Sequence, residues 1–142
     1  MVTGGAGFIG SHLSERLLKD GHQVIVLDSA STGRLSNLNG VIDSPQFQVI
    51  EGSILDNQLL TRLIGDSDYV FHLAAAVGVF NIVNNPLASL LTNIRGTENV
   101  LEAACATNTP VFLASSSEVY GKNISDSLLE SDDRILGSPV TL

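Results

Sequence analysis

Three glycines spaced three residues apart, Gly4, Gly7 and Gly10, stand just ahead of a helical pattern. This spacing predicts a tight turn from a strand into a helix. The first glycine permits the turn, the second lets phosphates approach the backbone, and the third lets the helix pack closely on a sheet. The first N–H groups of a helix lack intrahelical partners, so this turn favours an anion such as a pyrophosphate. Glycine-rich turns also serve plain strand-to-helix connections, so the motif alone does not settle the ligand.

Apolar runs and helical periodicities alternate along the rest of the chain. Strands are predicted at residues 2–3, 24–27, 47–50, 69–73 and 111–114. Helices are predicted at 8–20, at 57–65 after an Asp56 cap, and at 86–106 behind Pro86. In the first helix, Ile9, Leu13 and Leu17 are predicted to form one apolar face. This alternation predicts an α/β chain with a doubly wound parallel sheet in the order 3-2-1-4-5, whose first strand is clipped.

Composition excludes several classes of partner. The chain has 142 residues with 44% hydrophobic content, which favours one domain with its own core. A formal net charge of −8 opposes binding to nucleic acid and to anionic membranes. No apolar run is long enough to span a membrane and no secretion signal is present, so we expect a soluble, cytoplasmic protein. The lone Cys105 is predicted to be a small buried side chain, and His12, His22 and His72 lack metal-ligand spacing, so no metal site is expected.

Asp28 ends the second predicted strand, eighteen residues after Gly10. An acidic residue there can accept hydrogen bonds from an adenosine ribose, and it would repel a ribose 2′-phosphate. The interpretation therefore favours NAD over NADP, although Arg34 in the next loop leaves NADP open. The alternative is an aspartate that only ends a strand in a turn.

Two further segments follow strand ends, where ligands sit in open α/β sheets. Residues 74–78 are small, so they would let a cofactor approach the backbone, although small-residue packing is a competing explanation. Residues 115–121 are mostly polar and follow the fifth predicted strand. Residues 122–142 are polar and predicted to be irregular.

Residues 3–13, 71–75, 93–104 and 115–121 together resemble the NAD-dependent epimerase/dehydratase family, the extended short-chain dehydrogenases that act on nucleotide sugars. Within it the chain is most similar to UDP-glucuronate decarboxylases and UDP-sugar 4-epimerases. The resemblance implies a Rossmann-type fold, NAD as cofactor and a nucleotide sugar, most simply a UDP-sugar, as substrate. It also implies a possible homodimer that uses the helix at 86–106.

The resemblance further implies a role for individual residues. The cofactor-binding positions are Gly4, Gly7, Phe8, Ile9, Gly10, Asp28, Ser29, Thr32, Gly33, Arg34, Ser53, Ile54, Leu73, Ala74, Ala75 and Asn93. Ser53 stands where the family usually has an aspartate that contacts the adenine. Ser116 matches the catalytic Ser/Thr and Glu118 matches an acid of decarboxylase-like members. Ser116 is also one serine among three in a loop, and Glu118 could equally be a solvated carboxylate.

Such enzymes transfer a hydride from the sugar to NAD, change the keto intermediate by epimerisation, dehydration or decarboxylation, and return the hydride. Their base is the tyrosine of a Tyr-x-x-x-Lys pair. Here the tyrosines are Tyr69 and Tyr120, followed four residues later by Leu73 and Ile124. We therefore expect residues 1–142 to be an incomplete NAD-binding Rossmann domain, without the C-terminal strands and the substrate domain. The alternative is a non-catalytic NAD-binding sensor or assembly module.

Overall fold

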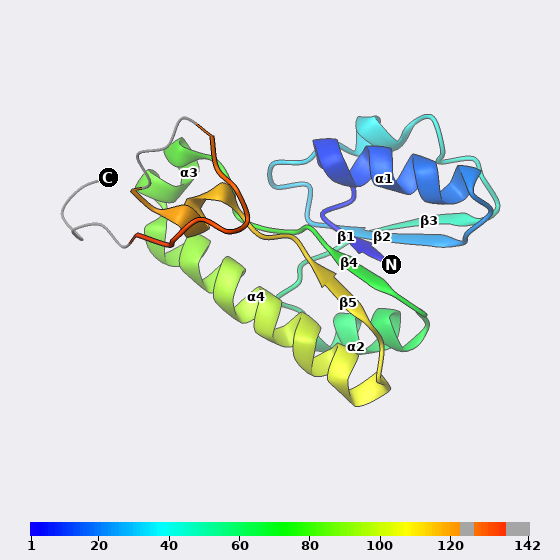
Figure 1. Cartoon of the computed structure of the whole chain (residues 1–142). Coiled ribbons are helices and arrows are strands. Elements are labelled where there is room, and N and C mark those ends of the chain that lie inside the picture. The colour runs from blue at the N-terminus through cyan, green and yellow to red at the C-terminus, as the bar shows by residue number, and fades with distance from the viewer. Residues whose placement is uncertain (123–126, 136–142) are drawn as a thin grey trace.

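The structure, a computed structural model, describes residues 1–122 and 127–135, and in this part of the chain five strands form one parallel sheet. The strands are β1 (Val2–Thr3), β2 (Val24–Asp28), β3 (Phe47–Glu51), β4 (Val70–His72) and β5 (Val111–Leu113). Their order is β3-β2-β1-β4-β5, and each neighbouring pair is parallel. The predicted order and the doubly wound α/β class are confirmed (Figure 1).

Helices cover both faces of this sheet. In the described residues they are α1 (Phe8–Lys19), α2 (Asn57–Gly65), α3 (Val79–Asn84) and α4 (Pro86–Thr107), with short 3-10 helices η1 (Leu35–Leu38) and η2 (Ser117–Tyr120). Helix α1 lies on one face and α2 and α4 lie on the other (Figure 1). None of the described helices is both long and apolar enough to cross a membrane. Of the stretch 122–142, residues 123–126 and 136–142 lie outside the described part of the chain.

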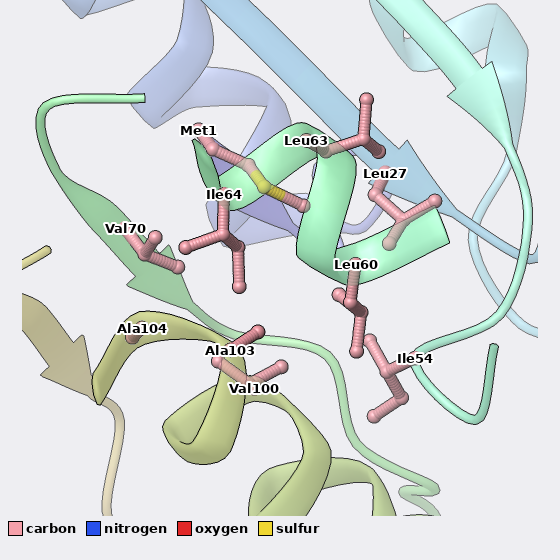
Figure 2. Packing of buried hydrophobic residues seen from close by; sticks show 10 residues of the cluster. All are labelled: Met1, Leu27, Ile54, Leu60, Leu63, Ile64, Val70, Val100, Ala103 and Ala104. Carbon is pink, nitrogen blue, oxygen red and sulfur yellow. The ribbon is translucent and has the colours of Figure 1, made fainter. Parts of the chain in front are cut away.

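The larger core cluster fills the space between the sheet and the α2–α4 pair. Leu60 and Ile64 of α2 pack with Val100 of α4 and Val70 of β4, and all four are fully buried (Figure 2). The Asp56 carboxylate accepts the Leu59 N–H at 3.0 Å, which confirms the predicted cap of α2. This cluster holds α4 against the sheet, so the start of α4 lies beside the strand ends.

Strand β1 has two residues and lies at the centre of the sheet. Val2 pairs with Val26 of β2 on one side and with Phe71 of β4 on the other, and its side chain is fully buried. The Gly4 N–H continues this ladder by donating to the Leu27 carbonyl oxygen at 2.8 Å. The glycine turn is therefore anchored by its neighbours despite the shortness of its strand.

The predicted apolar face of α1 is wrong at its first position, because Ile9 is 69% exposed. The buried residues of α1 are instead the small Gly10, Ser11 and Ser14. Only small residues fit where the helix leaves the turn, because a Cβ on Gly10 would overlap the backbone of Gly4 and Gly5. Leu13 and Leu17 are partly buried against the core, so helical period located the helix and two of the three face residues correctly and failed at Ile9.

Helix α4 begins at Pro86 as predicted and ends at Thr107, with Asn108 in a left-handed conformation at φ 56°. Its buried face consists mainly of Gly96, Asn99, Val100 and Ala103. Cys105 is exposed, so the predicted burial of this side chain is wrong. Cys105 directly follows two buried alanines in the sequence, but its side chain lies outside the contact with α2 that buries them.

Candidate functional site

The glycine turn forms the floor of a cavity of about 340 Å³ at the carboxyl ends of the strands. Gly4 has a φ of +71°, and its N–H pairs with β2 while its carbonyl accepts the Gly7 N–H at 3.1 Å. A Cβ on Gly4 would lie 2.8 Å from the Ala74 nitrogen, so only glycine fits between the turn and the end of β4. Gly4 and Gly7 both line the cavity.

The N-terminus of α1 is open toward an anion. Gly7 occupies the N-cap position without a side-chain cap, and the first turn carries no acidic residue. The side chains of Phe8 and Ile9 are 79% and 69% exposed and do not line the cavity, so these two positions offer backbone N–H groups only. Gly10 lies beneath the turn, where it permits the helix to pack.

Asp28 lies at the end of β2, is 8% exposed and lines the cavity. Its Oδ2 accepts the Ala6 N–H at 2.8 Å and its Oδ1 accepts the Ala30 N–H at 2.8 Å. A carboxylate has about four acceptor positions, so two remain after these bonds. The backbone thus fixes the orientation of the acid and leaves acceptor capacity for a ligand.

The loop after β2 is bonded to the glycine turn. The Ala6 carbonyl accepts the Arg34 N–H at 3.1 Å and the Asn37 side-chain amide at 2.8 Å. Gly33 packs against the Ala6 backbone, where a Cβ would come within 3.0 Å of the Ala6 carbonyl carbon. Three predicted loop residues line the cavity, namely Ser29, Thr32 and Gly33, whereas the exposed Arg34 does not.

Two more segments predicted from the sequence form walls of the same cavity. Leu73, Ala74 and Ala75 line it at the end of β4, followed by Ala76 and Val77. Ser53 and Ile54 line it after β3, although Ile54 is mainly a core residue at 5% exposure.

Asn93 lies outside the lining and acts on the wall through the backbone. Its Nδ2 donates to the Ala76 carbonyl at 3.2 Å, and its Oδ1 accepts the Ala76 N–H at 2.7 Å. This pair of bonds joins α4 to the segment after β4. Asn93 therefore holds the cavity wall in place, and the cofactor-binding role that the resemblance implies for it stays a prediction.

Sequence reasoning missed the wall that α4 supplies, formed by Ala88, Ser89 and Thr92. Ser89 is 4% exposed, and its Oγ is buried without a hydrogen-bond partner in the described structure. A buried hydroxyl without a partner is costly unless a ligand or a water satisfies it. The signal was available, because Ser89 and Thr92 are polar residues three apart at the start of a largely apolar helix.

The predicted catalytic residues lie beyond β5. Ser116 precedes η2, where its Oγ accepts the Glu118 N–H at 3.2 Å. Both side chains are exposed, and neither lines the cavity. Among the described residues, no three His, Cys, Asp or Glu side chains gather as metal ligands would.

Comparison with known proteins identifies the family. Residues 1–134 match the family described as GDP-mannose 4,6 dehydratase. The UDP-N-acetyl-alpha-D-glucosaminuronate decarboxylase of Bacillus cytotoxicus is 42% identical over 141 residues, covering 97% of this chain and 42% of that protein. The chain belongs to the NAD-dependent epimerase/dehydratase family, as the sequence motifs predicted.

Two solved structures have the same fold over nearly the whole chain. The UDP-N-acetylglucosamine 4-epimerase from Methanobrevibacter ruminantium has a TM-score of 0.85 at 37% identity, covering 97% of this chain and 44% of its own. The dTDP-glucose 4,6-dehydratase DesIV from Streptomyces venezuelae, solved with NAD, has a TM-score of 0.86 at 36% identity, covering 94% and 44%. The predicted cofactor agrees with the NAD in that structure. The chain spans less than half the length of each of these relatives.

Proposed function

We propose that residues 1–142 act as the NAD-binding domain of a protein that modifies a nucleotide sugar. The observation that carries this proposal is the Asp28 carboxylate, which two backbone N–H groups orient at the edge of a cavity floored by the glycine turn. An acid in this position accepts hydrogen bonds from an adenosine ribose, and the turn beside it receives a pyrophosphate.

Several structural features fit a dinucleotide in this cavity. Gly4 and Gly7 line the cavity, and the first turn of α1 presents N–H groups without an acidic side chain. The buried Ser89 Oγ, which lacks a partner, would gain one from a polar ligand. A cavity of about 340 Å³ is within the range of ligand sites, about 300–1,000 Å³.

Each wall then has a role toward NAD. The turn at Gly4 and Gly7, with the N–H groups at Phe8 and Ile9, holds the pyrophosphate. Asp28 binds the adenosine ribose, with the loop at Ser29, Thr32 and Gly33 beside it and Arg34 outside. Ser53 and Ile54 lie on the adenine side. The remaining wall residues cover the cofactor from β4 and α4, and they are Leu73, Ala74, Ala75, Ser89 and Thr92.

The chemistry of the whole protein is transient oxidation of a sugar. Bound NAD supplies a hydride acceptor that later returns the hydride, so the reaction is redox-neutral overall. Ser116 hydrogen-bonds to a substrate hydroxyl, and Glu118 accepts a proton or a hydrogen bond beside it; both are exposed and so are accessible to a sugar. UDP-sugars are the proposed substrates, because several relatives are named for them.

Calorimetric titration of residues 1–142 tests this proposal. We expect NAD to bind with a micromolar dissociation constant and NADP to bind at least about tenfold more weakly, because the Asp28 carboxylate repels a 2′-phosphate. Adding a UDP-sugar to the NAD complex should produce no NADH absorbance, because no Tyr-x-x-x-Lys pair occurs in these residues. Folded protein that releases no heat with NAD would refute the cofactor assignment.

The proposal includes a homodimer that packs through α4. Five large apolar side chains of this helix are exposed, at Leu87, Leu90, Leu91, Ile94 and Leu101. An exposed apolar face of this extent is typical of an interaction site. The first four recur at helical spacing, so they cover one side of the helix.

Light scattering after gel filtration measures the oligomeric state. We expect a dimer at micromolar concentration, and we expect the Leu90→Glu/Ile94→Glu double variant to be monomeric because buried carboxylates oppose packing. Ile42→Glu is the matched control, because Ile42 is an exposed apolar residue in the loop before β3. A wild-type monomer would contradict the dimer.

A further inference from the structure

We infer that His72 is a positioning residue for the cofactor site: it ties the sheet to α4 through two hydrogen bonds and thereby sets the spacing of two cavity walls. Its Nδ1 lies 2.7 Å from the Thr3 Oγ1 of β1, and its Nε2 lies 3.0 Å from the Thr97 Oγ1 of α4. The ring is 2% exposed, so no water competes for these bonds. This inference rests on the proposed NAD binding.

The direction of the bonds follows from the donors around Thr3. The Ala74 N–H donates to the Thr3 Oγ1 at 3.2 Å, and the Leu73 N–H is shared at 3.2 Å between this Oγ1 and the Thr3 carbonyl. A hydroxyl has one hydrogen and two acceptor positions; both backbone donors face the acceptor side of the Thr3 Oγ1, so its hydrogen goes to the His72 Nδ1. The imidazole is therefore neutral with its hydrogen on Nε2, which donates to the Thr97 Oγ1.

Both ends of this chain of bonds lie next to the cavity. Leu73 and Ala74 line it, and the backbone of Ala74 lies against Gly4 so closely that no Cβ fits between them. At the other end, Thr97 belongs to the helix whose first turns supply Ser89 and Thr92 to the opposite wall. A loss of the His72–Thr97 bond would remove the direct side-chain tie between β4 and the middle of α4, so the spacing of the two walls would be held less tightly.

Protonation of His72 would disrupt this network. An imidazolium donates from both nitrogens, so the Thr3 Oγ1 would face three donors and its own hydrogen would lose its acceptor. Burial lowers the pKa of His72 from its ordinary value, so the neutral ring dominates at pH 7. Affinity for NAD should fall only at a pH below the ordinary titration range of histidine, because the pKa is lowered and only the neutral form holds the wall.

No charged neighbour accounts for the lowered pKa of His72. Burial is the cause of the lowered pKa of His72, without a contribution from a charged group. The charged or titratable groups on or next to β1, β4, β5 and α4 are the Met1 amino group, Asp68, Tyr69, Arg95, Glu98, Glu102 and Cys105. Arg95 and Glu98 pair with each other on the exposed side of α4.

The test is a double-mutant cycle on NAD affinity. Thr97→Val removes the acceptor of the His72 Nε2–H, and His72→Asn keeps an oxygen for the Thr3 hydroxyl but cannot reach Thr97. We expect each single variant to weaken NAD binding about tenfold. The double variant should bind no more weakly than either single variant, because both substitutions remove the same His72–Thr97 bond. Thr61→Val, which removes an exposed hydroxyl bonded to the Asn57 carbonyl on α2, should leave affinity unchanged. Additive losses, or wild-type affinity in Thr97→Val, would overturn the inference.

Two readouts separate this inference from simple destabilisation and from failure of NAD binding itself. The fall in affinity at acidic pH should disappear in His72→Asn and persist in Thr97→Val, because only the first removes the titrating group. Without any ligand, amide exchange at Leu73 and Ala74 should be about tenfold faster in Thr97→Val. If wild-type protein bound no NAD, the proposed function would fail, and unchanged exchange at these amides would independently refute the role of His72.

Discussion

Replacing Gly4 by alanine is expected to destabilise the protein by about 2–5 kcal/mol and to abolish NAD binding. Two effects add. The left-handed φ of +71° costs an L-residue about 1–2 kcal/mol, and a Cβ would lie 2.8–2.9 Å from backbone atoms of Leu73 and Ala74. These are backbone atoms held at the end of β4, so they cannot move aside as a side chain would, and overpacking adds about 1–3 kcal/mol.

Gly21→Ala separates the two contributions. Gly21 has a φ of +89° at the end of α1, and a Cβ there would meet nothing within 4 Å. It should lose only the conformational part, about 1–2 kcal/mol, and should bind NAD normally. Urea denaturation followed by circular dichroism gives both free energies of unfolding. Equal losses in the two variants would show that contact with the end of β4 does not restrict Gly4.

The sheet order and the glycine turn could be predicted because their signals are local. Val24 to Asp28 is an uninterrupted apolar run that ends in an acid, and such a run forms a parallel strand buried on both faces. Gly4 and Asp28 meet because adjacent parallel strands end at the same edge of the sheet. The second predicted strand and the turn therefore locate the cavity from local sequence signals alone.

The remaining features depend on packing between elements that are distant in the sequence. Ile9 and Cys105 lie on regular helices, yet both are exposed, because the surfaces that bury their neighbours are small-residue contacts on one side of each helix. Ser89 lies in the cavity wall because packing between α2 and α4 holds α4 against the sheet. The side-chain amide of Asn93 bonds to the Ala76 backbone, 17 residues away in the sequence, and no local sequence pattern predicts this contact.

The preference for NAD over NADP should decrease when the Asp28 carboxylate is removed. In Asp28→Asn we expect NAD affinity to fall about 10- to 100-fold, because the ribose loses a charged acceptor worth about 1.5–3 kcal/mol. The substitution also disturbs the loop. An asparagine presents one oxygen and one NH₂ group, so one of the two backbone N–H groups, of Ala6 or Ala30, would face a donor instead of an acceptor.

The ratio of NAD to NADP affinity distinguishes these two effects. A distorted loop weakens both cofactors alike and leaves the ratio unchanged, whereas removal of the carboxylate also removes its repulsion of the 2′-phosphate, so the ratio should fall at least about tenfold. Glu51→Gln is the matched control: Glu51 pairs with Asp28 across β2 and β3, carries the same charge, is exposed, and does not line the cavity. Titrations with both cofactors at one ionic strength measure the ratio. If Asp28→Asn and Glu51→Gln gave the same ratio as wild type, Asp28 would only shape the loop, and the acid at the end of β2 would have no part in choosing the cofactor.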